Sequence, residues 1–469
     1  MVCSGGEGGL PANSPPVVAV LDLCAARARA RRRPASFIAW AAAIFFSSSY
    51  SLFAGDEISA PAASTTSAWA NGPYLTGDWG GQRTRLQDDG IAPYLIYTSI
   101  VADNASGGLR QGGPKYAQDV NPGVTFDLQK LAGWDGATFN LNGVDRAGHT
   151  IKPEVGSVYD PVEIYGGQTY TLYNVTLEQR FLDDKAAFKI GRLSAGDDFA
   201  ESPLYNYYVN NGIDGQIRAV IDDTRFKTYP FAVWGARLRF DPDPQFNLQT
   251  GLFEAPDRIT DRANHGIDFA LNSHDGIMLV EQLGWTPTFG EPGALNPKAV
   301  PPHTGLPGHY FAGGWWSNAD YPQFGTNQRT HVSYGFYAHG DQMVYRPEPG
   351  SDVGLTLFGT AAYAPQPNIS IIPFQLSGGA LYQGLVPDRP ADMSILGVIW
   401  GTFSDDYADT LEPQYDARAT SEVDLELGYR FQFTPFAYAQ PDLQYVVQPG
   451  GTGNISNAFI LAAQFGLTF

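Results

Sequence analysis

The chain has 469 residues, of which only 16% are charged and 13% are aromatic, and its formal net charge is −19. Soluble globular domains carry roughly 25% charged residues, so something other than charge must make the surface of this protein compatible with its solvent. An acidic chain also lacks the basic surface that phosphate binding requires, which argues against a nucleic-acid partner.

A secretory leader is predicted at the start of the chain. Five arginines between residues 27 and 33 precede the apolar run FIAWAAAIFF at 37–46, and small residues follow at 47–51. This order is typical of a signal peptide, and the apolar run is shorter than the ~20 residues of a membrane-spanning helix. We therefore assign residues 1–55 to the leader and expect translation to start downstream of Met1, because the Gly- and Pro-rich residues before the arginines are too long for a basic region.

Residues 56–72 are rich in Ser, Thr, Ala and Pro, and this composition predicts a flexible spacer. Both cysteines, Cys3 and Cys24, precede the apolar run, so the remaining chain can form neither a disulfide framework nor a thiolate metal site. No segment after residue 72 approaches 18 consecutive apolar residues, and no membrane-spanning helix is expected there. Residues 73–469 are therefore predicted to form either a soluble periplasmic protein or a single membrane barrel.

Alternation of apolar and polar residues predicts strands along this domain. A first hairpin covers 232–253, with its turn at the two prolines of Asp241-Pro242-Asp243-Pro244, where the missing N–H donors should end the strand. In 277–285 the alternation fails, because Glu281 shares the parity of leucines and Trp285, so a bulge or a strand end is expected. A further strand begins at Val353 and turns at 365–368.

The clearest alternation lies at 423–433, where apolar side chains from Val423 to Phe433 share one face and charged ones share the other. After a break at Thr434 and Pro435, a second strand continues to residue 447. In the last strand, the residues of one face are Phe459, Leu461, Ala463, Phe465, Leu467 and the terminal Phe469. An aromatic residue that ends such a strand resembles the signal by which the barrel-assembly machinery recognises outer-membrane proteins.

These strands predict an all-β fold, a closed transmembrane antiparallel barrel with a water-filled lumen. In hydrocarbon every backbone polar group must bond within the protein, which forbids an open sheet edge. Apolar side chains then face lipid, polar ones face the lumen, and aromatic residues collect at the two interfaces. About 24 residues for each strand and its connection give roughly 16 strands. A homotrimer contact and a lipid contact would both be apolar, so the oligomeric state stays open.

Several motifs resemble the OprB-type carbohydrate-selective porin family. They are LTGDWGGQRTRL at 75–86, SGGLRQGG at 106–113, LQKLAGWDGATF at 128–139, KIGRLSAGDDFAESPLY at 189–205, SDVGLTLFGTAAYAPQPN at 351–368, LELGYRFQFTP at 425–435 and QPDLQYVVQPGG at 440–451. The resemblance covers essentially the whole mature chain. It implies a barrel of roughly 16 strands through which monosaccharides and small oligosaccharides diffuse passively. We expect this porin in the outer membrane of a Gram-negative bacterium, with no catalytic residue, cofactor or metal.

Three sets of charged residues are candidates for contact with a sugar, because arginine donates several hydrogen bonds and a carboxylate accepts two hydroxyls. Arg83 and Arg85 could enter the lumen or anchor the N-terminal segment by salt bridges. Arg192, Asp197 and Asp198 lead into a segment, SPLYNYYVNNG, that is expected to fold into the pore and form a constriction, unless it is an extracellular loop. Lumen parity selects the third set, which could also be solvated wall without sugar contact: Arg237, Arg239, Asp424, Glu426 and Arg430.

Two other function classes compete with a selective porin. A general diffusion porin would share the fold without a sugar preference, and a periplasmic carbohydrate-binding or hydrolysing protein would be soluble. Adjacent carboxylates such as Asp405 and Asp406 are weak support for hydrolysis, since neighbours on a strand point to opposite faces. The seven histidines show no metal-protease spacing.

Overall fold

The computed structural model describes residues 69–165, 167–290 and 305–469, and the predicted leader lies outside these ranges. Within them, antiparallel strands form a closed ring, in which each strand pairs with its sequence neighbours and β1 pairs with β19. The predicted barrel of about 16 strands is thereby confirmed as a closed 16-strand antiparallel barrel. No helix in the described ranges is both long and apolar enough to cross a bilayer.

The strands of the ring are β1 (Ile91–Gly108), β2 (Lys115–Asp127), β3 (Ala137–Gly148), β4 (Thr169–Phe181), β5 (Ala186–Leu193), β6 (Val233–Asp243), β7 (Phe246–Glu254), β8 (Ile277–Trp285), β10 (Leu306–Ser317), β13 (Ser333–Tyr345), β14 (Gly354–Tyr363), β15 (Phe374–Gln383), β16 (Met393–Thr402), β17 (Ser421–Thr434), β18 (Ala437–Val447) and β19 (Ser456–Thr468). The two-residue strand β9 (Thr288–Phe289) pairs with β10, whereas β11 (Tyr321–Pro322) and β12 (Arg329–Thr330) form a separate two-stranded sheet.

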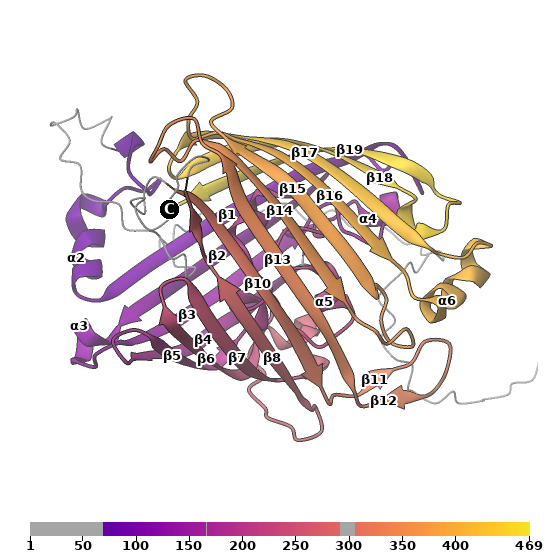
Figure 1. Ribbon diagram of the computed structural model, residues 1–469, viewed down its shortest axis with the longest axis horizontal. Helices are drawn as coiled ribbons and strands as arrows, with labels where there is room; N and C mark the ends of the chain where they lie inside the picture. Colours follow the sequence, from indigo (N-terminus) through magenta and orange to yellow (C-terminus); the bar gives the residue numbers. More distant parts are fainter. Residues whose placement is uncertain (1–68, 166, 291–304) are drawn as a thin grey trace, which may run out of the picture. The chain divides into compact units, whose positions relative to one another are not determined.

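Short helices occupy the connections. They are α2 (Gln82–Asp88), α3 (Leu128–Ala132), α4 (Lys152–Val155), α5 (Arg218–Asp222) and α6 (Asp405–Tyr415), with 3-10 turns η1 (Trp79–Gly81), η2 (Ala195–Asp197), η3 (Pro203–Tyr207), η4 (Arg258–Thr260), η5 (Arg262–Asn264) and η7 (Pro449–Gly451). A side-chain cap begins α3, where the Asp127 carboxylate accepts the backbone N–H groups of Gln129 and Lys130. Figure 1 shows α2 and α3 at one end of the barrel, and α6 with β11 and β12 at the other.

The outer face of the barrel is apolar, as the alternation predicts. On β17 the side chains of Leu425, Leu427 and Phe433 are exposed, whereas those of Glu422, Asp424 and Glu426, on the opposite face of the strand, are buried inside the barrel. The β17–β18 hairpin has the predicted partners, with Val423 opposite Val447 and Leu427 opposite Leu443. On β19 the exposed outward residues are Phe459, Leu461 and Phe465. An apolar outer wall around a polar interior is the inverse of a soluble fold.

Two details of the predicted strands are wrong. The β6–β7 turn is formed by Pro244 and Gln245, and β6 continues through Pro242, which lies at a register irregularity between Phe240 and Asp243 where the missing donor costs no ladder bond. In β8 neither a bulge nor a strand end intervenes at Glu281. Its carboxylate lies exposed on the outer face and accepts a hydrogen bond from the Thr250 hydroxyl of β7 at 2.7 Å.

The N-terminal segment packs on one end of the barrel. Trp69, which belongs to the predicted spacer, lies 5.0 Å from the Phe436 ring, measured between ring centroids, and the Leu75 N–H donates to the Thr468 carbonyl. The Arg83 side chain lies over the rings of Tyr74 and Trp79, at 3.7 and 4.3 Å from their centroids. The segment therefore lies at the end of the barrel that holds the short β4–β5, β6–β7 and β17–β18 turns.

Candidate functional site

The β5–β6 loop, residues 194–232, lies inside the barrel. Its backbone N–H groups of Val209 and Asn210 donate to the Glu426 carboxylate at 2.7 and 3.2 Å, and the Asn210 amide donates to Asp424 at 2.7 Å. Both carboxylates belong to the lumen face of β17 and are at most 1% exposed. The prediction that the SPLYNYYVNNG segment folds into the pore is thus confirmed, and the wall residues that hold it are covered by the loop instead of solvated.

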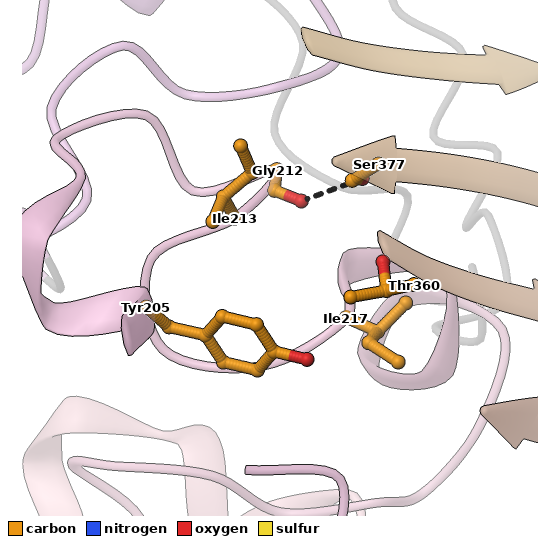
Figure 2. Close-up of a pocket in the computed structure, with 6 residues that line it drawn as sticks. All are labelled: Tyr205, Gly212, Ile213, Ile217, Thr360 and Ser377. Carbon is orange, nitrogen blue, oxygen red and sulfur yellow. Dashed lines mark hydrogen bonds between the residues drawn. The ribbon is translucent and has the colours of Figure 1, made fainter. Parts of the chain in front are cut away.

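The same loop packs against the wall formed by β14 and β15 (Figure 2). The Gly212 carbonyl accepts hydrogen bonds from the Ser377 hydroxyl at 3.2 Å and from the Gln375 amide at 2.9 Å. Figure 2 shows Tyr205 and Ile217 of the loop beside Thr360 in this seam. The β5–β6 loop is therefore bonded to this part of the wall as well as to β17.

The β3–β4 loop, residues 149–168, is also attached to β17 by hydrogen bonds from its backbone to a carboxylate. The Glu422 carboxylate of β17 accepts the backbone N–H groups of Val158 and Tyr159 at 2.8 and 3.0 Å, and that of Gly450 at 2.5 Å. The two inward loops also join each other, since the Asp160 N–H donates to the Asn211 side chain at 2.7 Å. Each loop is therefore attached to β17 through carboxylates of its own, and the two loops are also linked to each other.

A cavity of about 310 Å³ lies between β3 and the two inward loops. Its charged lining residues are Arg146, Lys152, Asp160, Glu163, Asp214, Arg218 and Lys227, and its aromatic ones are Tyr165, Phe226, Tyr229 and Phe231. Both signs of charge are present in similar number, together with ring faces. This lining suits a small, uncharged molecule that carries many hydroxyls, because such a molecule needs donors, acceptors and an apolar platform together.

Arg146 of β3 is the central cation of this cavity. Its guanidinium lies 3.5 Å from the Asp119 carboxylate of β2 and 3.4 Å from that of Glu163, and 4.7 Å from the centroid of the Tyr229 ring. The Tyr229 hydroxyl in turn donates to Asp119 at 2.9 Å. These contacts fix the plane of the guanidinium, while its Nε is buried without a hydrogen-bond partner. A guanidinium held in this way presents its donors in one orientation.

The loop groups around Arg146 have shifted proton affinities. Burial raises the pKa of Asp160, and burial together with the Glu163 carboxylate raises that of Asp214 well above its usual value. Burial, and secondly the charge of Arg225, lowers the pKa of Lys227 to about 7. The pKa of Arg218 is raised, since its contacts with Asp222, at 2.6 Å, outweigh the burial that opposes them. The cavity therefore changes its charge near neutral pH.

The structure places the first two predicted sets away from this cavity lining. Arg83 is buried by its aromatic neighbours in α2, and Arg85 is exposed on the same helix. Arg192 pairs with Trp234 on the outward parity of the wall, and it donates to the carbonyls of Ala232, at 2.7 Å, and of Asp268. Arg192 therefore joins the β5–β6 loop to the β7–β8 loop.

Apart from Arg239, the remaining candidates bond within or to the inward loop. Asp197 accepts hydrogen bonds from the Tyr173 hydroxyl and from the Asn174 amide, the latter at 2.7 Å. Asp198 forms ion pairs with Lys189 at 2.7 Å and with Arg237 at 3.0 Å. Arg239 forms an ion pair with Asp241 at 2.8 Å. Arg430 donates a hydrogen bond to the Asn206 carbonyl at 2.7 Å and lies over the rings of Tyr207 and Tyr438. As sugar contacts, all of these residues stay predictions.

Sequence reasoning missed the charged residues that line the cavity. The sequence does contain a signal for Arg146, because Asn140, Asn142, Val144 and Arg146 occupy alternate positions of 137–148 and therefore share one face. In the β2–β3 ladder, Arg146 lies opposite Asp119. Glu163 and Asp214 had none, since they lie in irregular loop segments, and Arg218 begins the five-residue helix α5, which is too short to show a period.

Comparison with known proteins agrees with this architecture. Residues 111–469 match the model of the family described as carbohydrate-selective porin, OprB family. Porin B of Pseudomonas aeruginosa is 26% identical over 433 residues, which cover 85% of this chain and 92% of that protein. The high-pH structure of Pseudomonas putida OprB superposes with a TM-score of 0.77 at 25% identity, covering 85% of this chain and 99% of that one. The low-pH structure of the same protein gives 0.57 at 21% identity and the same coverage.

Proposed function

The chain belongs to the carbohydrate-selective porin, OprB family, and from this premise we propose that it selects sugars in the cavity around Arg146. It is an outer-membrane channel with a β-barrel fold, and the family and fold are those of porins and not of enzymes. Porin barrels have short periplasmic turns and long extracellular loops, so the end with the N-terminal segment faces the periplasm. A sugar then meets the two inward loops before it reaches the periplasm.

The observation that carries the proposal is the combination of fixed donors and acceptors around one small space. Arg146 and Arg218 supply guanidinium donors, Asp160 and Glu163 supply carboxylate acceptors, and Tyr229 supplies a ring face. A sugar can exchange its hydration for these groups, whereas a solute without paired hydroxyls leaves them unsatisfied. Because the sugar must also leave on the far side, each contact should be shallow.

The test is liposome swelling with the purified full-length protein. We expect glucose and other monosaccharides to enter faster than amino acids of the same size and faster than disaccharides. Equal rates for all solutes of equal size would contradict the proposal and would indicate a general diffusion channel in its place.

We expect the preference for charged sugars to depend on pH through Lys227. Its pKa near 7 means that the ammonium forms as pH falls below 7, while the raised pKa values of Asp160 and Asp214 remove negative charge in the same direction. Entry of a sugar acid relative to glucose should therefore rise about fivefold from pH 8.5 to pH 6, since a unit charge near an anion contributes about 1 kcal/mol. In parallel swelling assays, Lys227→Met should lose the part of this rise that is centred on pH 7. An unchanged pH profile of sugar-acid entry would exclude Lys227 as the source of the rise.

We also propose that residues 1–55 are removed on export and that the assembly machinery recognises the last strand through Phe469 and the outward row that precedes it. The outward aromatic residues Phe459 and Phe465 support this proposal. Replacement of Phe469 by alanine should reduce the folded protein in outer-membrane fractions severalfold, as measured by heat-modifiable migration on gels, with unchanged synthesis. N-terminal sequencing of the protein purified from these fractions should place the cleavage between Ser51 and Ala60.

A further inference from the structure

A cluster of metal-binding side chains lies on the inner wall outside the cavity lining. His309 of β10 and His339 and Asp341 of β13 each offer one ligand atom, and these three atoms lie within 4.8 Å of one another. The Asp341 Oδ2 atom is 3.3 Å from His309 Nδ1 and 2.8 Å from His339 Nε2. The ladder explains this convergence, because His309 pairs directly with Asp341, and His339 shares its lumen-facing parity.

The donor set is that of a transition-metal site. Two imidazole nitrogens and one carboxylate oxygen are ligands of Zn²⁺, at about 2.0–2.2 Å each, and three protein ligands leave a fourth position for water. Ligands at these distances from one ion lie on the order of 3.3 Å apart in tetrahedral geometry, so small side-chain rotations suffice. Alkaline-earth ions prefer all-oxygen sites and fit this set poorly.

The surroundings hold the ligands in the orientation that a metal requires. The second ring nitrogen of His339, Nδ1, lies 2.8 Å from the Tyr205 hydroxyl, and its ring stacks on Phe311 at 4.9 Å between centroids. A metal-binding histidine typically uses its other nitrogen in such a hydrogen bond, which fixes the tautomer and the ring. The His339 side chain is fully buried, whereas that of His309 is 31% exposed, which gives an ion access from the lumen.

We propose that His309, His339 and Asp341 bind one Zn²⁺ or a similar transition-metal ion and thereby fasten the β5–β6 loop to the wall. The loop reaches this cluster through Tyr205 and through the Ser202 hydroxyl, which lies 3.4 Å from Asp341. An ion at this position locks the tautomer of His339 and so strengthens its contact with Tyr205. The loop that bounds the sugar cavity then fluctuates less.

Metal binding can be measured on the full-length protein, purified without a histidine tag and stripped with a chelator. Isothermal titration with Zn²⁺ should give one site per chain at pH 7.5, and Co²⁺ should give the visible absorption of a nitrogen- and oxygen-ligated ion. His309→Ala should weaken the affinity at least about tenfold, since the loss of outer partners alone costs that much. His331→Ala is the matched control, because His331 is an exposed histidine 3.8 Å from a carboxylate, Asp320, and should bind as the wild type does.

Equal affinity of the wild type and His309→Ala, or an equal loss in His331→Ala, would overturn the site. His309 is the first choice because its partly exposed ring can be removed with less damage than His339, and heat-modifiable gel migration verifies folding. Single-channel recording tests the fastening: Zn²⁺ should reduce open-channel noise in the wild type but not in His309→Ala. Zn²⁺ binding with unchanged noise would overturn the fastening.

Discussion

Replacement of Arg146 by alanine is expected to lower the preference of the channel for glucose over an uncharged non-sugar of the same size by about tenfold or more. A hydrogen bond to a charged group contributes about 1.5–3 kcal/mol, and the Arg146 guanidinium lines this cavity beside Glu163. The free pore area should not decrease, because alanine is smaller, so the entry of small non-sugar solutes should be equal or faster. Liposome swelling with matched solute pairs measures this ratio.

Two further variants separate charge from geometry at this position. Arg146→Lys keeps the positive charge near Asp119 and Glu163 but loses the planar donor set, and it should give an intermediate preference. Arg239→Ala is the matched control, because Arg239 is also a wall arginine with one carboxylate partner, Asp241, but does not line the cavity. An unchanged sugar preference in Arg146→Ala, or an equal loss in Arg239→Ala, would refute the assignment of selection to this cavity.

The outer wall could be predicted from the sequence because lipid imposes one simple requirement on it. Side chains such as Leu425, Leu427 and Phe465 must be apolar at every second position, and this period survives in a single sequence. Glu281 breaks the period without breaking the strand, because the Thr250 hydroxyl satisfies its carboxylate locally. The cost of one acidic side chain on the outer face is small enough for the rest of β8 to determine its pairing.

The contents of the lumen could not be predicted in the same way. Parity identifies Asp424, Glu426 and Arg430 as inward, but it does not tell whether an inward side chain meets water, a solute or a loop. The answer depends on the β5–β6 loop. Its Asn210 donates hydrogen bonds to Asp424 and Glu426, and its Asn206 carbonyl accepts one from Arg430. Arg192 illustrates the other difficulty: it is selected from a motif without a strand assignment, and its parity on β5 places it on the outward side, where the β7–β8 loop covers it.

Substitution of Glu422 by alanine should release the β3–β4 loop from the wall. Three backbone N–H groups, those of Val158, Tyr159 and Gly450, lose their acceptor in a buried place. Each buried donor left without a partner costs about 1–3 kcal/mol, so we expect a loss of local stability of about 3 kcal/mol. This corresponds to about hundredfold faster amide exchange in 157–160, which hydrogen-exchange mass spectrometry measures, and the released loop should also admit disaccharides.

Glu281→Ala is the control for this variant, because it removes a carboxylate of the same length from the outer face, where a single side-chain hydroxyl contacts it. Neither exchange in the β3–β4 loop nor disaccharide entry should change in that protein. The β5–β6 loop should keep its slow exchange in Glu422→Ala, since Glu426 and Asp424 still hold it through Val209 and Asn210. Simultaneous fast exchange in both loops would show that they open as one unit, and it would contradict their separate attachment to β17.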